Sequence, residues 1–172
     1  MLARYDILLK THPLKTKMTS NFVIGCTADF LCQNMQYGSY QDVKRSLRQG
    51  SIMCLVQSPA LHLFFKHVIP RVVFATSFPK TFFARIAAHL CMVTPYMHST
   101  LFFGVGALQT FSLEGGKRKW NEKFKPGMHY AMHYWPFVAA VLYSGKVPLR
   151  WGNLVFDSFG LIWQVFLSWF IS

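Results

Sequence analysis

The sequence has few charged side chains and very few acids. Of its 172 residues 14% are charged, with 18 Lys and Arg against 6 Asp and Glu, and the net charge is +12. Soluble domains carry roughly 25% charged residues, so this chain has too few to cover a water-exposed surface. Its apolar content of 52% is also too high for a disordered protein or for a chain that wraps nucleic acid.

The chain lacks the short motifs that mark many enzymes. It contains no glycine-rich phosphate loop, no nucleophile elbow and no paired-carboxylate motif. His129 and His133 are four residues apart, but the residues between them supply no acid and no third metal ligand is apparent. We therefore expect no catalytic residues, no cofactor and no metal, and a protein that is not an enzyme.

Long stretches without basic residues are the main feature that is present. A helix rises ~1.5 Å per residue, so about 20 residues cross a hydrocarbon core of ~30 Å. Four stretches reach that length, and a fifth of 17 residues approaches it if its flanking basic side chains extend to the headgroups. The stretches are 18–41, 49–65, 86–113, 126–145 and 151–172.

These stretches predict an all-α fold in which four to five apolar helices with proline kinks form a polytopic membrane bundle. We expect one membrane-embedded domain over residues 1–172. A soluble helical bundle is the alternative, but it would need charged residues on its outer helix faces, and residues 86–113 contain none.

Prolines lie near the middle of three stretches and predict kinked helices. Pro59, Pro95 and Pro136 each remove one backbone donor and bend their helix. Such bends fit either a central cavity or a bundle that packs around the kinks. Small residues on shared helix faces predict close helix contacts, and these pairs are Gly25 with Ala28, Ala84 with Ala88, and Gly104 with Ala107.

Residues 1–17 form a basic, partly amphipathic lead-in. They have neither the apolar core nor the cleavage site of a secretory signal. A retained mitochondrial address or an interfacial helix would explain this composition, and so would an ordinary soluble segment. The C-terminal residues are not the Ser-Lys-Leu peroxisomal signal.

A few polar side chains interrupt the apolar stretches and are candidate functional groups. Asp29 lies in the middle of the first stretch, and Gln33 follows one turn later on the same helix face. An acid at that depth costs ~3 kcal/mol unless it is protonated, paired or hydrated. Asp29 is therefore either a polar lining group or an anchor to another helix. Further intramembrane candidates are Gln57, His62, His89 and His98.

Charged residues gather at the ends of the apolar stretches. Asp42 and Arg45 lie three apart at a predicted membrane edge, where a surface pair is worth a few tenths of a kcal/mol. The densest basic cluster follows the third stretch directly, so we expect it to contact anionic headgroups such as cardiolipin, or an acidic partner, and not nucleic acid. This basic cluster consists of Lys117, Arg118, Lys119, Lys123 and Lys125.

Several motifs resemble those of one membrane protein family. The stretch IWQVFLSW, residues 162–169, is similar to a signature in which Ile-Trp-Asn is followed by an aromatic residue, Leu-Ser and often Trp. In the same order as in that family, the chain also contains Asp29 with Gln33, Asp42 with Arg45, Ser58-Pro59 with His62 and Phe65, Trp135-Pro136 and Val147-Pro148. From Gly25 to Trp169, the chain resembles the Mpv-seventeen and peroxisomal-membrane-protein family.

The resemblance implies an integral protein of the mitochondrial inner membrane or, alternatively, of the peroxisomal membrane. It further implies channel-like or metabolite-homeostasis roles and no enzymatic chemistry. The family residues that would shape the bundle are Pro59, Trp135, Pro136, Pro148, Trp163 and Ser168.

The chain departs from the family pattern at several polar positions. The family has Asp-Gln where this chain has His89 and Leu90, Gln in place of Ala139, and Asn-Phe in place of Tyr143 and Ser144. These losses favour a structural accessory subunit that packs against other subunits of an inner-membrane complex. The alternative is a pore or carrier for small metabolites.

Overall fold

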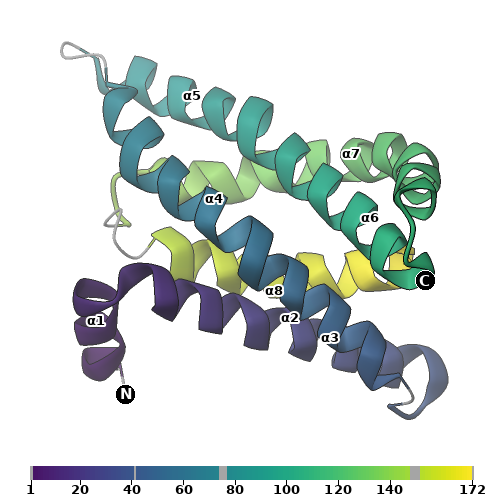
Figure 1. Cartoon of the computed structure of the whole chain (residues 1–172). Helices are drawn as coiled ribbons and strands as arrows, with labels where there is room; N and C mark the ends of the chain where they lie inside the picture. Colours follow the sequence, from purple (N-terminus) through teal and green to yellow (C-terminus); the bar gives the residue numbers. More distant parts are fainter. Residues whose placement is uncertain (1, 41, 74–76, 148–151, 172) are drawn as a thin grey trace.

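The computed structural model describes residues 2–40, 42–73, 77–147 and 152–171, which form a bundle of helices with no strand among them (Figure 1). The predicted all-α fold is thereby confirmed. The short helix α1 turns away from α2 at one end of the bundle (Figure 1). The chain passes through α1 (Leu2–Thr11), α2 (Pro13–Tyr37), a long helix over Val43–Arg71, another over 78–110, α7 (Leu113–Tyr143) and α8 (Gly152–Ile171).

Two of the long helices are composite, because wide π-type turns interrupt them. The first consists of α3 (Val43–Ile52), η1 (Met53–Gln57), α4 (Ser58–Leu63), η2 (Phe64–Val68) and the 3-10 turn η3 (Ile69–Arg71). The second consists of α5 (Phe78–Ala88), η4 (His89–Val93) and α6 (Thr94–Thr110).

Each π-type turn ends two residues before a proline. η1 precedes Pro59, η2 precedes Pro70 and η4 precedes Pro95. A proline supplies no N–H, and its ring clashes with the carbonyl four residues earlier. The residue before each proline instead donates its N–H to the carbonyl five residues back, which widens the turn. These bonds run from Ser58 to Met53, from Ile69 to Phe64 and from Thr94 to His89.

Local signals set the helix boundaries that the charge pattern misses. α2 begins at Pro13, within the predicted lead-in, and ends before Gly38, whose φ of 69° suits a residue without a side chain. Phe111, with φ of 51°, ends α6 inside the stretch 86–113. α7 then begins after Ser112, whose Oγ accepts the N–H of Gly115 at 3.1 Å.

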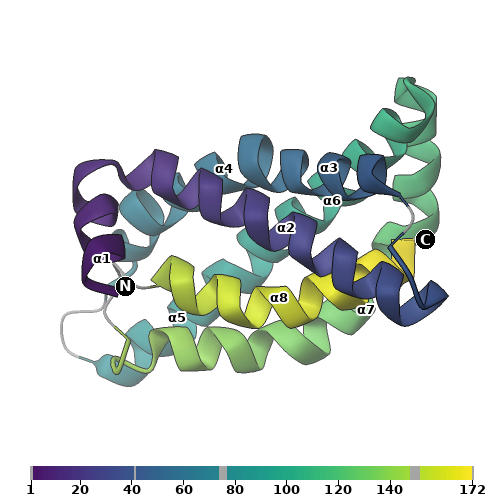
Figure 2. The ribbon, with the colours of Figure 1, turned by 90° about the horizontal axis from the view of Figure 1, so that it is seen from below.

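Proline also accounts for the shape of α7. Figure 2 shows that this helix changes direction sharply between a first part, which packs against α6, and a second part, which runs beside α8. Pro126 and Pro136 both lie inside the helix, where each removes one backbone bond. The bend separates the basic first part of α7 from its apolar second part.

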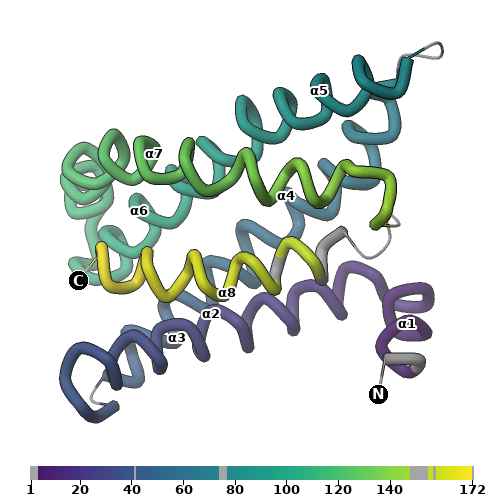
Figure 3. The backbone as a smooth tube through the Cα atoms, turned by 180° about the vertical axis from the view of Figure 1, so that it is seen from behind, coloured from purple at the N-terminus to yellow at the C-terminus, as the bar shows by residue number. Residues whose placement is uncertain are grey.

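Aromatic rings fill much of the core between α4, α6, α7 and α8. The rings of Trp135 and Phe156 stack with centroids 4.7 Å apart, and those of Tyr134 and Trp163 stack at 5.1 Å. Figure 3 shows α8 between α2 and α7, and it contacts both helices. α8 therefore joins the two sides of the bundle.

Glycines allow close helix contacts inside the bundle. A Cβ on Gly25 would lie 2.9 Å from the Cα of Gly50, so α2 and α3 approach backbone to backbone at this predicted small-residue face. A Cβ on Gly104 would lie 2.9 Å from Cδ1 of Ile52. The Gly104 face is thus occupied by a side chain of the same protein.

Among the described residues, one helix is long and apolar enough to cross a membrane by length and composition, and it spans Val43–Arg71. The apolar part of α8, Ser158–Ile171, is shorter. This criterion therefore supports fewer spanning helices than the four to five that the stretches without basic residues predict. Large apolar side chains nevertheless cover parts of the outer surface, including Phe83, Phe111 and Phe137.

Candidate functional site

A buried carboxylate joins three helices. Asp29 on α2 is 0% exposed, and its Oδ1 lies 2.7 Å from Nε of Arg45 on α3. Ser168 on α8 donates its hydroxyl to the same oxygen. Oδ2 accepts hydrogen bonds from Nε2 of Gln33 at 2.7 Å and from Oγ of Ser46 at 2.6 Å. Both carboxylate oxygens are thus paired, which a buried charge requires.

Gln33 and Arg45 extend this network to the backbone. The Oε1 of Gln33 accepts the N–H of Asp42 at 2.7 Å, and its Nε2 donates to the carbonyl of Asp42 at 2.9 Å. Nη2 of Arg45 donates to the carbonyl of Ser168 at 3.0 Å. The network ties the start of α3 to α2 and to α8. This geometry places Asp29 and Gln33 in an anchor between helices.

The predicted surface pair between Asp42 and Arg45 is wrong. Asp42 caps α3, because its Oδ1 accepts the backbone N–H of Arg45 at 2.9 Å, while the guanidinium of Arg45 turns inward to Asp29. Attraction between charges is stronger in the buried environment of Asp29 than at the surface.

Asp29 and Ser168 are 139 residues apart, so no local pattern could have shown that they meet.

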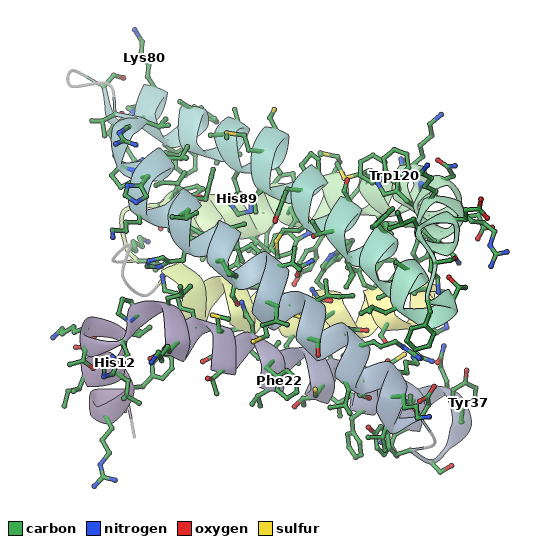
Figure 4. The ribbon with its side chains drawn as sticks, viewed as in Figure 1. His12, Phe22, Tyr37, Lys80, His89 and Trp120 are labelled. Atoms are coloured by element: carbon green, nitrogen blue, oxygen red, sulfur yellow. The ribbon has the colours of Figure 1, made fainter. Side chains whose placement is uncertain are left out.

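A second group of polar side chains surrounds a central chamber of about 20 Å³. This volume is large enough for about one water molecule. All five long helices contribute to its wall, and Figure 4 shows His89 in the middle of the bundle. The described residues that line the chamber include no Asp, Glu, Lys or Arg.

Eight buried polar atoms on residues of the chamber wall have no hydrogen-bond partner in the described part of the chain. Their residues are between 0% and 6% exposed, so neither the surrounding protein nor bulk water satisfies these atoms. Each such group costs roughly 1–3 kcal/mol when it is left unpaired. The atoms are Asn21 Oδ1, Gln57 Oε1, His89 Nε2, Thr94 Oγ1, His98 Nε2, Trp135 Nε1, Trp163 Nε1 and Gln164 Oε1.

The hydrogen bonds that these residues do make fix which of the unpaired atoms are acceptors. Asn21 donates Nδ2 to Oγ of Ser58 at 2.5 Å, and Gln57 donates Nε2 to the carbonyl of Met97 at 2.8 Å. Nδ1 of His98 lies 2.7 Å from the carbonyl of Thr94 and must donate to it, which leaves Nε2 as an acceptor in the neutral ring. The indoles of the two tryptophans can only donate. The wall therefore offers both hydrogen-bond acceptors and donors.

The irregular helix geometry helps to create the chamber. Gln57 ends the π-type turn η1, and His89 begins the π-type turn η4. Such turns occur often at functional sites. Gly160 is buried, yet a Cβ built on it would meet none of the described atoms within 4 Å. The missing side chain of Gly160 thus leaves part of the space in the chamber.

The predicted intramembrane candidates are distributed between the chamber wall, the network around Asp29 and a third position outside both. His89 lies on the chamber wall, whereas Asp29 and Gln33 belong to the anchor. His62 lies outside both groups, half-buried, with its Nδ1 3.4 Å from Nζ of Lys17. Sequence reasoning overlooked Asn21, Thr94 and Gln164 as lining groups, because each looks like an ordinary polar residue of a helix.

The family-motif residues also have definite places. Trp135 and Trp163 line the chamber, and Ser168 belongs to the anchor. Pro59 lies in the first turn of α4, and Pro136 lies inside α7. Pro148 falls outside the described residues.

The basic cluster is partly engaged within the protein. Lys119 Nζ donates to Oε1 of Gln109 at 2.7 Å, and Lys123 Nζ donates to the carbonyl of Phe170 at 2.7 Å and lies 4.8 Å from the centre of its ring. The exposed members of the cluster are Lys117, Arg118 and Lys125.

The two histidines considered as a metal pair contact each other without a third ligand. Nδ1 of His133 lies 2.9 Å from the carbonyl of His129, and the two rings are 4.9 Å apart. The described residues contain no group of three or more His, Cys, Asp or Glu side chains that could hold a metal ion.

Two fungal proteins are similar to this chain over nearly their whole length. Protein sym1 of Aspergillus oryzae is 30% identical over 173 residues, which cover 98% of this chain and 96% of that protein. Protein sym-1 of Neurospora crassa is 28% identical over 174 residues, with 98% of both chains covered. No protein-family profile matches the chain. No solved structure matches it either.

Proposed function

The chain belongs to the Mpv-seventeen and peroxisomal-membrane-protein family, the family of the fungal sym1 proteins, and on this basis we propose that it is a non-enzymatic polytopic protein of the mitochondrial inner membrane. Its apolar outer side chains suit contact with lipid, and its net charge of +12 suits a membrane rich in anionic lipid. The basic segment 1–17 favours a mitochondrial address. The peroxisomal membrane is the alternative.

Alkaline carbonate washing tests the membrane assignment. Mitochondria whose outer membrane has been removed are expected to retain the full-length protein in the pellet, because several apolar helices would have to leave the hydrocarbon core together. A known peripheral protein of the same membrane serves as the control for complete washing. Release of the chain with that control, or its recovery in peroxisomes alone, would contradict the assignment.

Within the membrane, we propose that the bundle provides a pore or carrier for a small polar solute. The observation that supports this role is the central chamber, where every long helix presents an unpaired buried polar group. A passing solute would satisfy these donors and acceptors in turn. The absence of charged residues among the described lining residues favours an uncharged solute, because an ion there would lose its hydration without a counter-charge.

The chamber as described is closed to anything larger than water. Its volume of about 20 Å³ requires that the helices separate before a larger molecule can pass. The wide turns η1 and η4 carry the lining residues Gln57 and His89 and lack part of the regular helix hydrogen bonding. They are the places where we expect the wall to move.

Flux measurements in proteoliposomes test this role. Vesicles that contain the protein are expected to pass water or small neutral solutes such as urea and glycerol faster than protein-free vesicles. Gly160→Leu should abolish the difference, because its side chain would occupy the chamber, and Gly160→Ala should reduce it. Ala87→Leu adds a similar volume on the outer face of α5 and should leave the flux unchanged.

Two results would contradict a pore or carrier. One is an absence of flux for every solute with correctly folded wild-type protein. The other is equal flux through wild type and through both Gly160 variants.

An accessory subunit of a larger inner-membrane complex is the second candidate. The exposed side chains of Lys117, Arg118 and Lys125 support it, since they could contact an acidic partner or cardiolipin. The Gly104 face offers no support, because Ile52 of the same chain packs there. A native gel after mild extraction distinguishes the candidates: an accessory subunit would migrate in a large complex, and a self-contained pore would not.

A further inference from the structure

A second pocket, of about 180 Å³, lies where α2, α3, α6 and α8 meet at one end of the bundle. This end carries Tyr37 in Figure 4 and the C-terminus in Figure 1. We call it the end pocket. Its polar lining comprises Tyr37, Arg45, Arg48, Gln49, Gln109 and Ser168. None of the described lining residues is an acid.

Two buried donors on the wall of the end pocket have no partner in the described part of the chain. They are Nε of Arg48 and Nε2 of Gln49, and Gln49 is only 4% exposed. A buried N–H that meets neither protein nor bulk water is unfavourable unless a ligand or an ordered water accepts it. Both residues belong to the lining of the end pocket.

The two arginines of the end pocket differ in how firmly they are held. Arg45 is fixed by Asp29 at 2.7 Å and by the carbonyl of Ser168 at 3.0 Å. Within the described part of the chain, Arg48 has one long contact with Asp42, at 3.6 Å between Nη2 and Oδ2, so much of its hydrogen-bonding capacity is unused. A guanidinium with unused donors beside an unpaired amide donor can bind phosphate oxygens well.

Lys119 adds positive charge at the rim, where its Nζ contacts Gln109 of the lining at 2.7 Å. The pKa of Lys119 is lowered to about 8, chiefly by burial and in addition by repulsion from Lys123, Arg45 and Arg48, against the attraction of Glu122. The positive groups are therefore close enough to repel one another. An anion among them would relieve that repulsion.

We propose that the end pocket binds a phosphate group, with Arg48 and Gln49 as its direct donors and Arg45 and Lys119 as flanking positive charges. The phosphate belongs either to a soluble anion or to the monoester headgroup of a lipid. The proposal goes beyond the solute path proposed above, because the end pocket shares no lining residue with the chamber.

Binding of inorganic phosphate to the full-length protein in mild detergent tests the soluble source. Isothermal titration at constant ionic strength, with chloride as the competing salt, should show saturable binding. In a separate thermal scan, phosphate should raise the midpoint of unfolding. Arg48→Gln should weaken this binding about tenfold, because it removes a charge-assisted donor. Gln49→Met, which keeps the shape but not the donor, should also weaken it. Lys44→Gln removes the same charge from an exposed site one turn away on α3 and should change binding by less than about twofold.

Nanodiscs test the lipid source. If the headgroup is the ligand, discs of phosphatidylcholine with phosphatidate should stabilise wild type more than discs of phosphatidylcholine alone, and Arg48→Gln should lose that stabilisation while Lys44→Gln keeps it. Either pattern supports the proposal and identifies the source.

The proposal is overturned if neither inorganic phosphate nor phosphatidate binds, or if Arg48→Gln and Lys44→Gln respond alike to both. Solute flux could fail while phosphate binds, so the two proposals can be judged separately.

Discussion

Asp29→Ala is expected to destabilise the bundle by about 3–5 kcal/mol, because it leaves the guanidinium of Arg45 buried without its counter-charge. The substitution also removes the acceptor for the hydroxyls of Ser46 and Ser168, so α3 and α8 lose their common contact to α2. Asp29→Asn keeps an acceptor but not the charge, and its effect should be smaller. Reversible unfolding in mixed detergent micelles, followed by circular dichroism, measures the change.

A double-mutant cycle separates the ion pair from general damage to packing. Arg45→Met alone should also be strongly destabilising, because it leaves the carboxylate of Asp29 buried without its charged partner. Combining it with Asp29→Ala should cost less than the sum of the two single changes. Asp42→Ala, which removes the cap of α3 and a long, partly exposed contact with Arg48, should cost about 1 kcal/mol. An Asp29 variant no less stable than the Asp42 variant would show that the buried pair contributes little.

Gly106→Ala is expected to destabilise the protein by about 3 kcal/mol. The new Cβ would lie 2.5 Å from the carbonyl oxygen of Gly115 and 2.8 Å from Cβ of Lys119. The first of these is backbone in the capped first turn of α7, so it cannot rotate away as a flexible side chain could. α6 and α7 would have to separate along the face where they touch most closely.

The same substitution at Gly160 is the matched control for Gly106. Its Cβ meets no atom within 4 Å, so Gly160→Ala should stabilise the helix by about 1 kcal/mol through backbone entropy alone. Unfolding midpoints of the two variants, measured in the same detergent, should therefore move in opposite directions. Two destabilising shifts would contradict the open space at Gly160, and two stabilising shifts would contradict the close contact of α6 with α7 at Gly106.

The sequence predicts the helical segments well because its signals for them are local. A run without charge, such as 126–145, marks a helix wherever its neighbours lie, and proline marks the irregular positions in the same way. The boundaries were less accurate. α7 starts at residue 113, well before that run, because Ser112 caps a helix whose first part is basic.

The site could not be predicted to the same extent, because its contacts join distant residues. Asp29 stood out as a costly acid, but Arg45 and Ser168 became its partners only once α3 and α8 were placed beside α2. His89 was predicted as a polar residue within an apolar stretch, whereas Asn21, Thr94 and Gln164 were not predicted as lining residues. The chamber exists only where five helices converge, and hydropathy along one helix does not encode that convergence.

The contacts of α8 impose an order on how the protein can be completed. The chain is made from its N-terminus, so Asp29 and Arg45 are synthesised long before Ser168. The chamber wall is likewise unfinished until Trp163 and Gln164 arrive. Until then the earlier helices carry polar groups whose final partner has not been synthesised. α8 therefore completes this fold last, and a chain truncated before it would leave Asp29 without the hydroxyl of Ser168 and the chamber wall without Trp163 and Gln164.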